Sequence, residues 1–363
     1  MATAESASCV DVVVCTCGGQ QYTVRDVVDA AFFRGQLYDS WKKFVRDMAA
    51  EERAVELDLD LDETAISNAA EAFRYQHDLI TAEETEAWLV KRGLTFGEFS
   101  DFFTRRYYAR AVGEDVVADD VEYNSASSDL RQSFMAELVF AGEFDRIATD
   151  FIRRLAARCA EPKPTSEAIS FEDCRFFQHS NLKPQDLTDW LKKIGRDRGW
   201  FAEMLAMEAV YHSCCQRILV PQARQRELAE LQLRLTQFET ELIGFKSRDA
   251  AKEALFCVRE DGMAMEQVAA EGPYPYCRAT FTLEDIPGDA QQTFASVSAG
   301  DILGPLARPD GFELCRVIAR IEPQPDDPNV QARIDRRLLE RHFSEVATRH
   351  IQRRFGGNLA SAE

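Results

Sequence analysis

The chain has 363 residues, enough for two or three domains, and its 45% hydrophobic and 29% charged residues exclude extensive disorder. Acidic residues outnumber basic ones 62 to 43, and the resulting net charge of −19 argues against nucleic acid and anionic membranes as partners. Such a charge would attract a basic or neutral partner, or it would serve solubility alone.

Ten cysteines are scattered along the chain without a Cys-x-x-Cys pair or a recognisable zinc-ligand spacing, so we predict no metal and no cofactor. Free thiols in this number are typical of a reducing compartment. Residues 1–8 lack the basic start and apolar run of a signal peptide, and no apolar stretch reaches the roughly 18 residues that a membrane span needs. The sequence therefore predicts a cytoplasmic protein without membrane insertion.

The N-terminal region begins with an apolar, β-branched run at residues 10–17, which predicts a strand followed by a turn at Gly18 and Gly19. Thr23 lies at a helix N-cap position with Asp26 three residues later, so a helix is expected from there to about Gly35. Residues 36–50 also favour a helix. Residues 55–62 alternate apolar and acidic side chains, and we expect a loop or the start of the next helix there, because acidic residues are poor in strands.

Two later stretches, residues 65–99 and 168–201, match each other. Both contain Ala-Ile-Ser, then Gln-His (His77 and His179), then Trp-Leu-x-x-x-Gly-x-x-x-Gly-x-Phe. This agreement predicts an internal duplication of a helical unit, with the aromatic residues in the core and each histidine packed on a helix. A weaker match between residues 134–140 and 238–245 predicts a strand leading into a helix in both places.

The C-terminal part, residues 237–321, predicts the order strand, helix, helix, loop, strand, helix, strand. Helices are expected at about 248–260 and 263–271, followed by a Pro/Tyr-rich loop and a helix that starts at Ile286-Pro287. Residues 299–305 are expected to form a turn, and residues 311–318 the last strand.

The Ile-Pro helix, the Gly-Asp-Ile-x-Gly-Pro turn and the strand from Gly311 to Val317 resemble a parvulin-type (PpiC-like) peptidyl-prolyl isomerase domain. The N-terminal strand, turn and Thr-capped helix, and a helix within residues 328–355, resemble the corresponding parts of SurA-type chaperones. The resemblance implies an α+β protein with a mostly helical chaperone domain and a parvulin-like antiparallel sheet. The implied divisions are a helical domain with the first repeat (1–160), the second repeat (161–236), the parvulin-like domain (237–322) and a returning C-terminal helix (323–363).

Parvulins bind a proline-containing segment between two histidines, a Cys or Asp, and a pocket of Met and two Phe. In this chain the first histidine position falls at Glu241, or at Leu242 if the register slips by one. The other positions of the family's site fall at Cys277, Asp285 (the Met), Asp289 (the first Phe), Phe294 (the second Phe) and Glu313 (the last-strand histidine).

No histidine lies between residues 213 and 341, so the parvulin-like part lacks both histidines of the family. We therefore predict weak or no isomerase activity and no catalytic residues. The hypothesis is a cytosolic chaperone or escort for an extended or precursor peptide of basic character, acting with a peptide-modifying enzyme or an exporter of a peptide maturation system. Its acidic site would comprise Glu241, Asp285, Asp289 and Glu313 around Phe294, with Cys277 nearby.

Three alternatives remain open at this point. The four acids could be solvated surface, the chain could be an active isomerase or use Cys15 and Cys17 in redox or metal chemistry, or it could be a scaffold subunit of a peptide-modifying complex.

Overall fold

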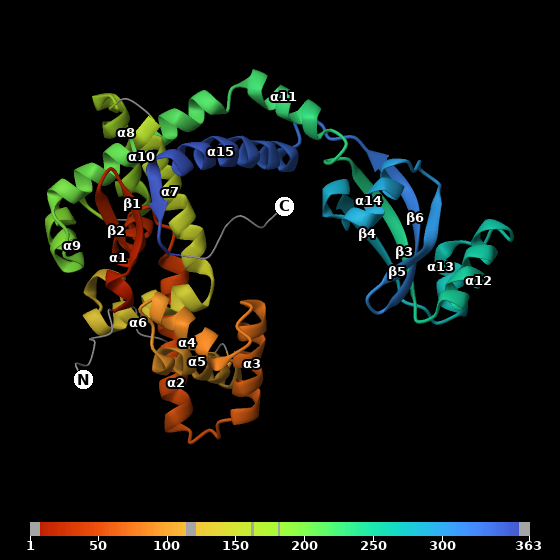
Figure 1. Cartoon of the computed structure of the whole chain (residues 1–363), viewed down its shortest axis with the longest axis horizontal. Coiled ribbons are helices and arrows are strands. Elements are labelled where there is room, and N and C mark those ends of the chain that lie inside the picture. The colour runs from red at the N-terminus through yellow and green to blue at the C-terminus, as the bar shows by residue number, and fades with distance from the viewer. Residues whose placement is uncertain (1–7, 114–120, 161–162, 181, 356–363) are drawn as a thin grey trace. The chain divides into compact units, whose positions relative to one another are not determined.

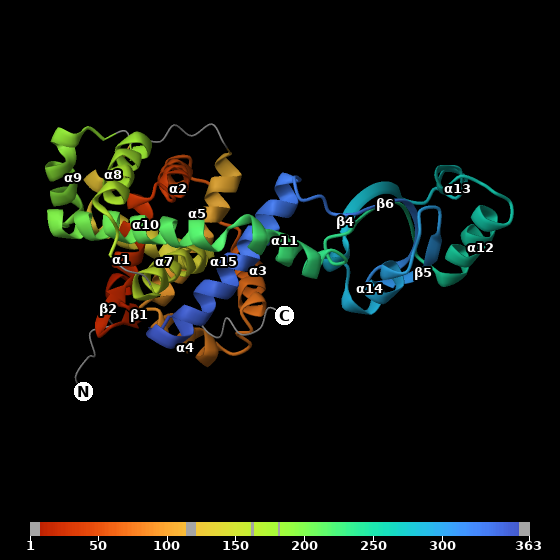
Figure 2. The same cartoon turned by 90° about the horizontal axis from the view of Figure 1, so that it is seen from above.

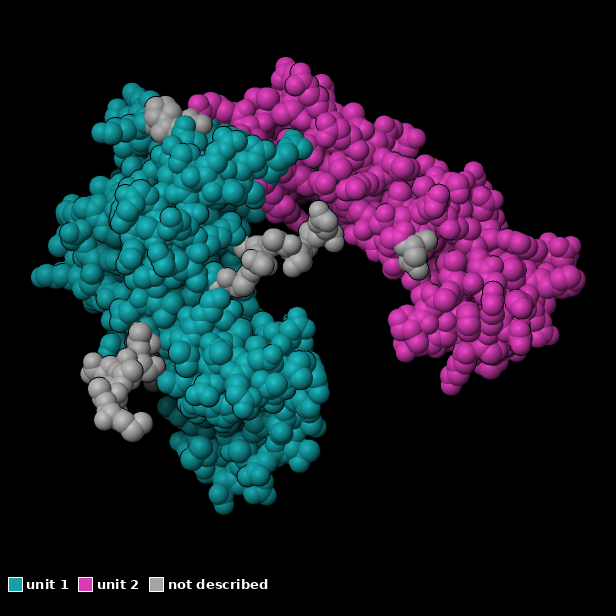
Figure 3. Space-filling view, viewed as in Figure 1, with its two compact units in different colours: residues 1–216, 341–363 teal, residues 217–340 magenta. Residues whose placement is uncertain are grey.

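The computed structural model describes residues 8–113, 121–160, 163–180 and 182–355, apart from the side chain of Asp289. It combines helices with two small antiparallel sheets, which confirms the predicted α+β class (Figure 1). The chain divides into two compact units: unit 1 is residues 1–216 with 341–363, and unit 2 is residues 217–340 (Figure 3). None of the described helices combines the length and apolar character that crossing a bilayer requires.

Unit 1 consists of helices and a three-stranded sheet of order β2-β1-β7. The last strand, β7, pairs antiparallel with β1, so strands from the two ends of the described chain are neighbours. The elements are η1 (Cys9–Asp11), β1 (Val13–Cys17), β2 (Gln20–Thr23), α1 (Val24–Phe33), α2 (Tyr38–Glu56), α3 (Glu63–Gln76), α4 (Ala82–Lys91), α5 (Phe96–Val112), η2 (Tyr123–Ser125), α6 (Ser128–Phe140), α7 (Glu143–Ala160), α8 (Ser166–Ser180), η3 (Pro184–Asp186), α9 (Leu187–Ile194), α10 (Arg198–Ile218), α15 (Pro328–His350) and β7 (Ile351–Arg353). Helices α10 and α15 continue into unit 2.

Local sequence signals predicted most of the first elements correctly. Thr23 caps α1 in a capping box with Asp26, as predicted, although the strand expected over residues 10–17 is shorter and follows a turn of 3₁₀-helix. The alternating segment at residues 55–62 contains the end of α2 and the loop before α3, so the preference for a loop over a strand is confirmed.

Residues 65–99 and 168–201 fold in the same way, as a helix, a short helix and the start of a long helix. In the first stretch the ring of Phe73 lies 5.6 Å from both Trp88 and Phe99. In the second, the ring of Phe176 lies 5.6 Å from Trp190 and 5.0 Å from Phe201. Both stretches therefore bury an aromatic residue of their first helix against the matched Trp and Phe.

The two histidines of these stretches are packed on helices, as the sequence predicts. His77 lies against Phe73 and Trp88, and burial lowers its pKa. His179 lies within hydrogen-bond distance of two backbone carbonyl oxygens, at 2.8 Å from Arg175 O and 2.8 Å from Phe33 O.

The strand expected at residues 134–140 is wrong, because these residues form the second half of α6. All seven are buried, so the segment shows no alternation between a polar and an apolar side. An apolar run without alternation fits a buried helix as well as a buried strand. The side chain of Ser127, which accepts a hydrogen bond from Leu130 N, caps the helix and was the local signal that favoured it.

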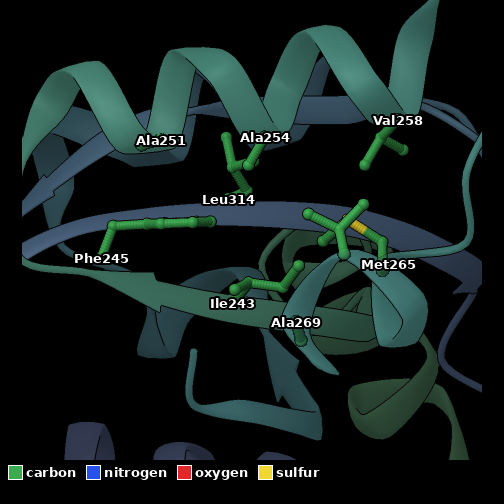
Figure 4. Packing of buried hydrophobic residues seen from close by; sticks show 9 residues of the cluster. Ile243, Phe245, Ala251, Ala254, Val258, Met265, Ala269 and Leu314 are labelled. Carbon is green, nitrogen blue, oxygen red and sulfur yellow. The ribbon is translucent and has the colours of Figure 1, made fainter. Parts of the chain in front are cut away.

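Unit 2 contains a four-stranded antiparallel sheet of order β4-β3-β6-β5, with helices on both faces (Figures 1 and 2). Helices α12 and α13 cover one face around Ile243, Phe245 and Leu314 (Figure 4), and α14 covers the other around Phe238. The elements are α11 (Pro221–Leu231), β3 (Gln237–Phe245), α12 (Arg248–Arg259), α13 (Met265–Glu271), β4 (Tyr276–Thr282), η4 (Leu283–Asp285), α14 (Gly288–Ala295), β5 (Ile302–Arg308) and β6 (Gly311–Ile321).

The turn expected at residues 299–305 is only partly correct. Residues 302–308 form the edge strand β5, whose pairing with β6 shifts register between Leu303 and Leu306. The intervening Gly304 has a φ of +130°, which is typical of glycine at a bulge. Gly-Pro in an apolar run is a turn signal, so the sequence predicts a turn at the position where the strand has a bulge.

The first part of α15 packs within unit 2 against α11 and the residues after it. Val330, Ile334 and Leu338 lie in one buried cluster with Leu231 and Leu235. The guanidinium group of Arg224 donates two hydrogen bonds to the Asp335 carboxylate, at 2.6 and 2.7 Å.

Candidate functional site

The sheet of unit 2 carries the residues that the parvulin resemblance singles out, and cross-strand pairing shows which of them share a face. Leu242 lies opposite Cys277 on β4 and Cys315 on β6, and Cys315 lies opposite Leu303 on β5. Directly paired residues have side chains on the same face of a sheet. These four residues therefore form a row, and three of them belong to the cluster around Phe294.

Glu241 lies on the opposite face. Neighbouring residues of a strand point to opposite sides, and the partners of Glu241 are Arg278 and Arg316. Glu241 therefore does not lie with Phe294, Cys277 and Glu313. The residue of β3 that shares their face is Leu242, the alternative obtained by a register slip of one.

The carboxylate of Glu241 is neutralised by arginines on the two neighbouring strands. Its Oε1 accepts hydrogen bonds from Tyr276 Oη at 2.9 Å and Arg278 Nη2 at 3.1 Å, and Arg316 Nη1 lies 3.8 Å from Oε2. Two arginines around one carboxylate give this group a net positive charge. These partners could not be predicted from the sequence alone, because they lie on other strands.

Phe294 belongs to the core rather than to an accessible surface. Its side chain is 2% exposed, and its ring lies 5.7 Å from that of Phe238 and 5.5 Å from that of Phe281. A bound proline ring could reach Phe294 only if other core side chains moved. The accessible apolar surface on this face comes instead from partly buried residues of the strands, namely Leu242, Phe281, Leu303 and Leu306.

Asp285 has a structural role in this fold. Its Oδ2 accepts hydrogen bonds from Thr282 Oγ1 at 2.6 Å and Thr282 N at 3.2 Å, and Arg333 Nη2 lies 3.6 Å away. These donors stabilise the carboxylate and lower its pKa, the Thr282 hydroxyl contributing most. Asp285 thus caps the turn of 3₁₀-helix η4.

The remaining two acids are Asp289 and Glu313. Asp289 is the second residue of α14, and its side chain lies outside the described part of the structure. Glu313 accepts hydrogen bonds from Arg308, at 2.6 Å from Nη2 and 3.1 Å from Nε. Each of the three acids whose side chains are described therefore has an arginine partner.

Cys277 and Cys315 lie in the same row but differ in exposure, and this difference predicts their reactivity. Cys277 is exposed, whereas Cys315 is buried, and burial raises the pKa of Cys315 to about 12. Because the thiolate is the reactive form, only on the order of 1 in 10⁴ Cys315 side chains is reactive at pH 8. We expect iodoacetamide to label Cys277 readily and Cys315 only after denaturation, as measured by peptide mass spectrometry.

Cys174, an exposed cysteine of unit 1, is the control for reagent access. Labelling of Cys315 at the rate of Cys277 in the folded protein would contradict the buried position of Cys315.

Groups of three or more His, Cys, Asp and Glu side chains suited to a metal ion do not occur among the described residues. The site that the geometry defines is therefore a half-buried apolar surface on the α14 side of the sheet, with Cys277 exposed and the Glu313–Arg308 pair on the same face.

The fold and site define an α+β protein whose second unit is an antiparallel sheet with helices on both faces. No protein-family model and no curated protein matches the chain. Solved structures similar to it are PrsA peptidylprolyl isomerases and a protein described as a SurA-like chaperone.

PrsA from Bacillus anthracis is 12% identical with a TM-score of 0.30, and the match covers 56% of this chain and 95% of that one. For PrsA from Bacillus cereus the identity is 10%, the TM-score 0.36, and the coverage 58% and 84%. For the SurA-like chaperone of Campylobacter jejuni the values are 7%, 0.19, 59% and 88%. These values describe a distant likeness.

Proposed function

We propose that unit 2 binds an extended peptide segment on the α14 side of its sheet and holds it without efficient prolyl isomerisation. The observation that carries this proposal is the histidine-free apolar row of Leu242, Cys315 and Leu303, whose two leucines are only partly buried. Partly exposed apolar side chains in a row along a sheet favour contact with the side chains of an extended chain.

Among the described residues, the same face carries Cys277 but neither of the two histidines that the resemblance implies. Glu313 lies at one of the two positions at which the resemblance implies histidines, and it is paired with Arg308. Of the two candidates for the other position, Glu241 and Leu242, Leu242 is the one that shares the face of Glu313. Rotation about a peptide bond has a barrier of roughly 18–20 kcal/mol, which a site must lower by stabilising the twisted bond. A leucine offers no hydrogen bond for this purpose.

The partner we propose is a precursor peptide, held in an extended state in the cytoplasm for a peptide-modifying enzyme or an exporter. The arginine partners of Glu241, Asp285 and Glu313 weaken the expected preference for a basic segment. We therefore assign most of the binding energy to apolar contacts and treat the basic preference as a secondary feature.

We also infer that residues 65–99 and 168–201 are copies of one helical unit. The equivalent contacts of Phe73 and Phe176 with the matched Trp and Phe support this inference. Gly93 and Gly195, at equivalent positions, both end a helix with positive φ, at +62° and +69°. Two such units give the chain a helical platform on which a modifying enzyme could dock.

The isomerase assay is the direct test of the non-catalytic part. With a short proline-containing peptide, we expect micromolar protein to leave the cis/trans isomerisation at its uncatalysed rate. The uncatalysed reaction takes about tens to hundreds of seconds at 25 °C. A marked acceleration that depends linearly on protein concentration would show an active isomerase and overturn this part of the proposal.

Binding is tested with Leu242→Asp, which places a carboxylate in the apolar row, and with Leu255→Asp as a matched control. Leu255 is also partly buried in unit 2, but it lies on α12 on the other side of the sheet. Because a carboxylate is costly to desolvate, we expect Leu242→Asp to weaken the binding of a labelled unfolded polypeptide at least tenfold, and Leu255→Asp to leave it nearly unchanged. If the two variants weakened binding equally, the α14 face would not be the binding site. A stable complex with one folded protein and no peptide binding would favour the scaffold alternative.

A further inference from the structure

Two cysteines that are far apart in the sequence meet in unit 1. Cys17 is the last residue of β1, and Cys159 is the last but one of α7. Their Sγ atoms are 3.0 Å apart, although the residues are 142 positions apart in the chain. A disulfide bond requires a separation of about 2.05 Å, so the sulfur atoms need to approach by only about 1 Å.

The surroundings of the two thiols differ in a way that gives them different roles. Cys159 is exposed, and Cys17 is half-buried. A reagent in solution therefore has less access to Cys17 than to Cys159, whereas the short distance between the two sulfur atoms keeps Cys17 within reach of Cys159. Cys159 is therefore the thiol that a soluble oxidant reaches first, and Cys17 is the neighbour that can displace the reagent from it.

We propose that Cys17 and Cys159 form a reversible disulfide that makes unit 1 responsive to oxidised glutathione or a similar small disulfide. In the first step the Cys159 thiolate attacks the S–S bond of glutathione disulfide, which forms a mixed disulfide and releases one glutathione. In the second step the Cys17 thiolate attacks Cys159 Sγ, the Cys17–Cys159 bond forms, and the second glutathione leaves as a thiolate that takes up the proton lost by Cys17. Two thiols are oxidised and one glutathione disulfide is reduced to two thiols.

This pairing differs from redox chemistry between Cys15 and Cys17. Cys15 is buried in β1, and burial raises its pKa to about 12. The partner that the fold brings to Cys17 comes from α7 rather than from its own strand. The bond would link the N-terminal strand to the end of α7 and close a loop of more than 140 residues. Closing a long loop stabilises a domain mainly by restricting its unfolded state.

The test uses the full chain in glutathione buffers of increasing oxidised fraction, followed by acid quenching, alkylation and peptide mass spectrometry. In the wild type we expect the Cys17 and Cys159 thiols to disappear together and one cross-linked peptide pair to appear. Dithiothreitol should restore both thiols. In Cys17→Ser, Cys159 should instead accumulate as its glutathione adduct, because the resolving thiol is missing.

Cys174→Ser is the matched control, because Cys174 is exposed on α8 and the substitution should leave the cross-link unchanged. Cys159→Ser also prevents the cross-link, and it changes an exposed position, so it should fold normally even if Cys17→Ser does not. Relative to oxidised Cys159→Ser, the oxidised wild type should unfold at a temperature roughly 5–10 °C higher. Glutathione adducts on Cys159 at the same level in the wild type and in Cys17→Ser would overturn the proposal, and so would a cross-link from Cys17 to a different cysteine.

Discussion

Replacing Glu208 with alanine is expected to destabilise unit 1 by about 3–5 kcal/mol, because two buried arginines then lose the carboxylate that pairs with both of them. Glu208 is 4% exposed on α10, and its Oε1 accepts a hydrogen bond from Arg154 Nε at 2.6 Å. Arg34 Nη1 lies 3.7 Å from the same oxygen. Burial and the neighbouring Arg154 lower the pKa of Arg34 to about 9, whereas the carboxylates of Glu208 and Asp150 act in the opposite direction, so removing Glu208 makes the proximity of the two cations more costly.

Urea denaturation followed by circular dichroism measures this effect. The matched control is Glu203→Ala on the same helix, which removes a pair with Arg158 at the surface and should cost no more than about 1 kcal/mol. Similar losses for the two variants would mean that the buried network contributes no more than an exposed ion pair.

Replacing Phe294 with alanine is expected to destabilise unit 2 by about 3–5 kcal/mol, since it removes a ring from the core between α14 and the sheet. The ring of Phe294 packs edge to face against those of Phe238 and Phe281. The change would leave a cavity next to the inner strand β3, whose residues contribute to the buried clusters on both faces of the sheet.

Phe256→Ala provides the control, because Phe256 is 60% exposed on α12 of the same unit and should change stability by less than about 0.5 kcal/mol. The measurement is again the free energy of unfolding, read together with peptide affinity. A Phe294→Ala protein with wild-type stability and no peptide binding would place Phe294 in the binding surface, as the parvulin resemblance implied, and not in the core.

The local parts of the fold could be predicted from the sequence. The capping box at Thr23 and Asp26 depends on residues three apart, and the loop at residues 55–62 follows from the poor strand propensity of its acids. The helix at residues 134–140 gives no signal in its periodicity, because its side chains are buried on all sides, and only the Ser127 cap favoured it. Strand β5 was obscured by Gly304 and Pro305 at its bulge.

The site was harder to predict than the fold, because its geometry depends on register and on distant partners. A shift of one residue in β3 exchanges Glu241 for Leu242 and moves the side chain to the other face of the sheet. The arginine beside Glu241 on β4 is 37 residues away, and the two sulfur atoms of Cys17 and Cys159 meet over 142 residues. Only the assembled sheets and helices bring such groups together.

The pairing of β1 with β7 also determines the order in which the chain can fold during synthesis. Strand β1 leaves the ribosome well before strand β7, so its second edge stays open until residues 351–353 have been made. All of unit 2, residues 217–340, is synthesised within that interval and can form its own sheet first. Until residues 351–353 have been made, unit 1 therefore has an unpaired strand edge of the kind that can pair with other nascent chains. Assembly of this protein consequently depends on an inserted unit that folds early and a host unit that closes last.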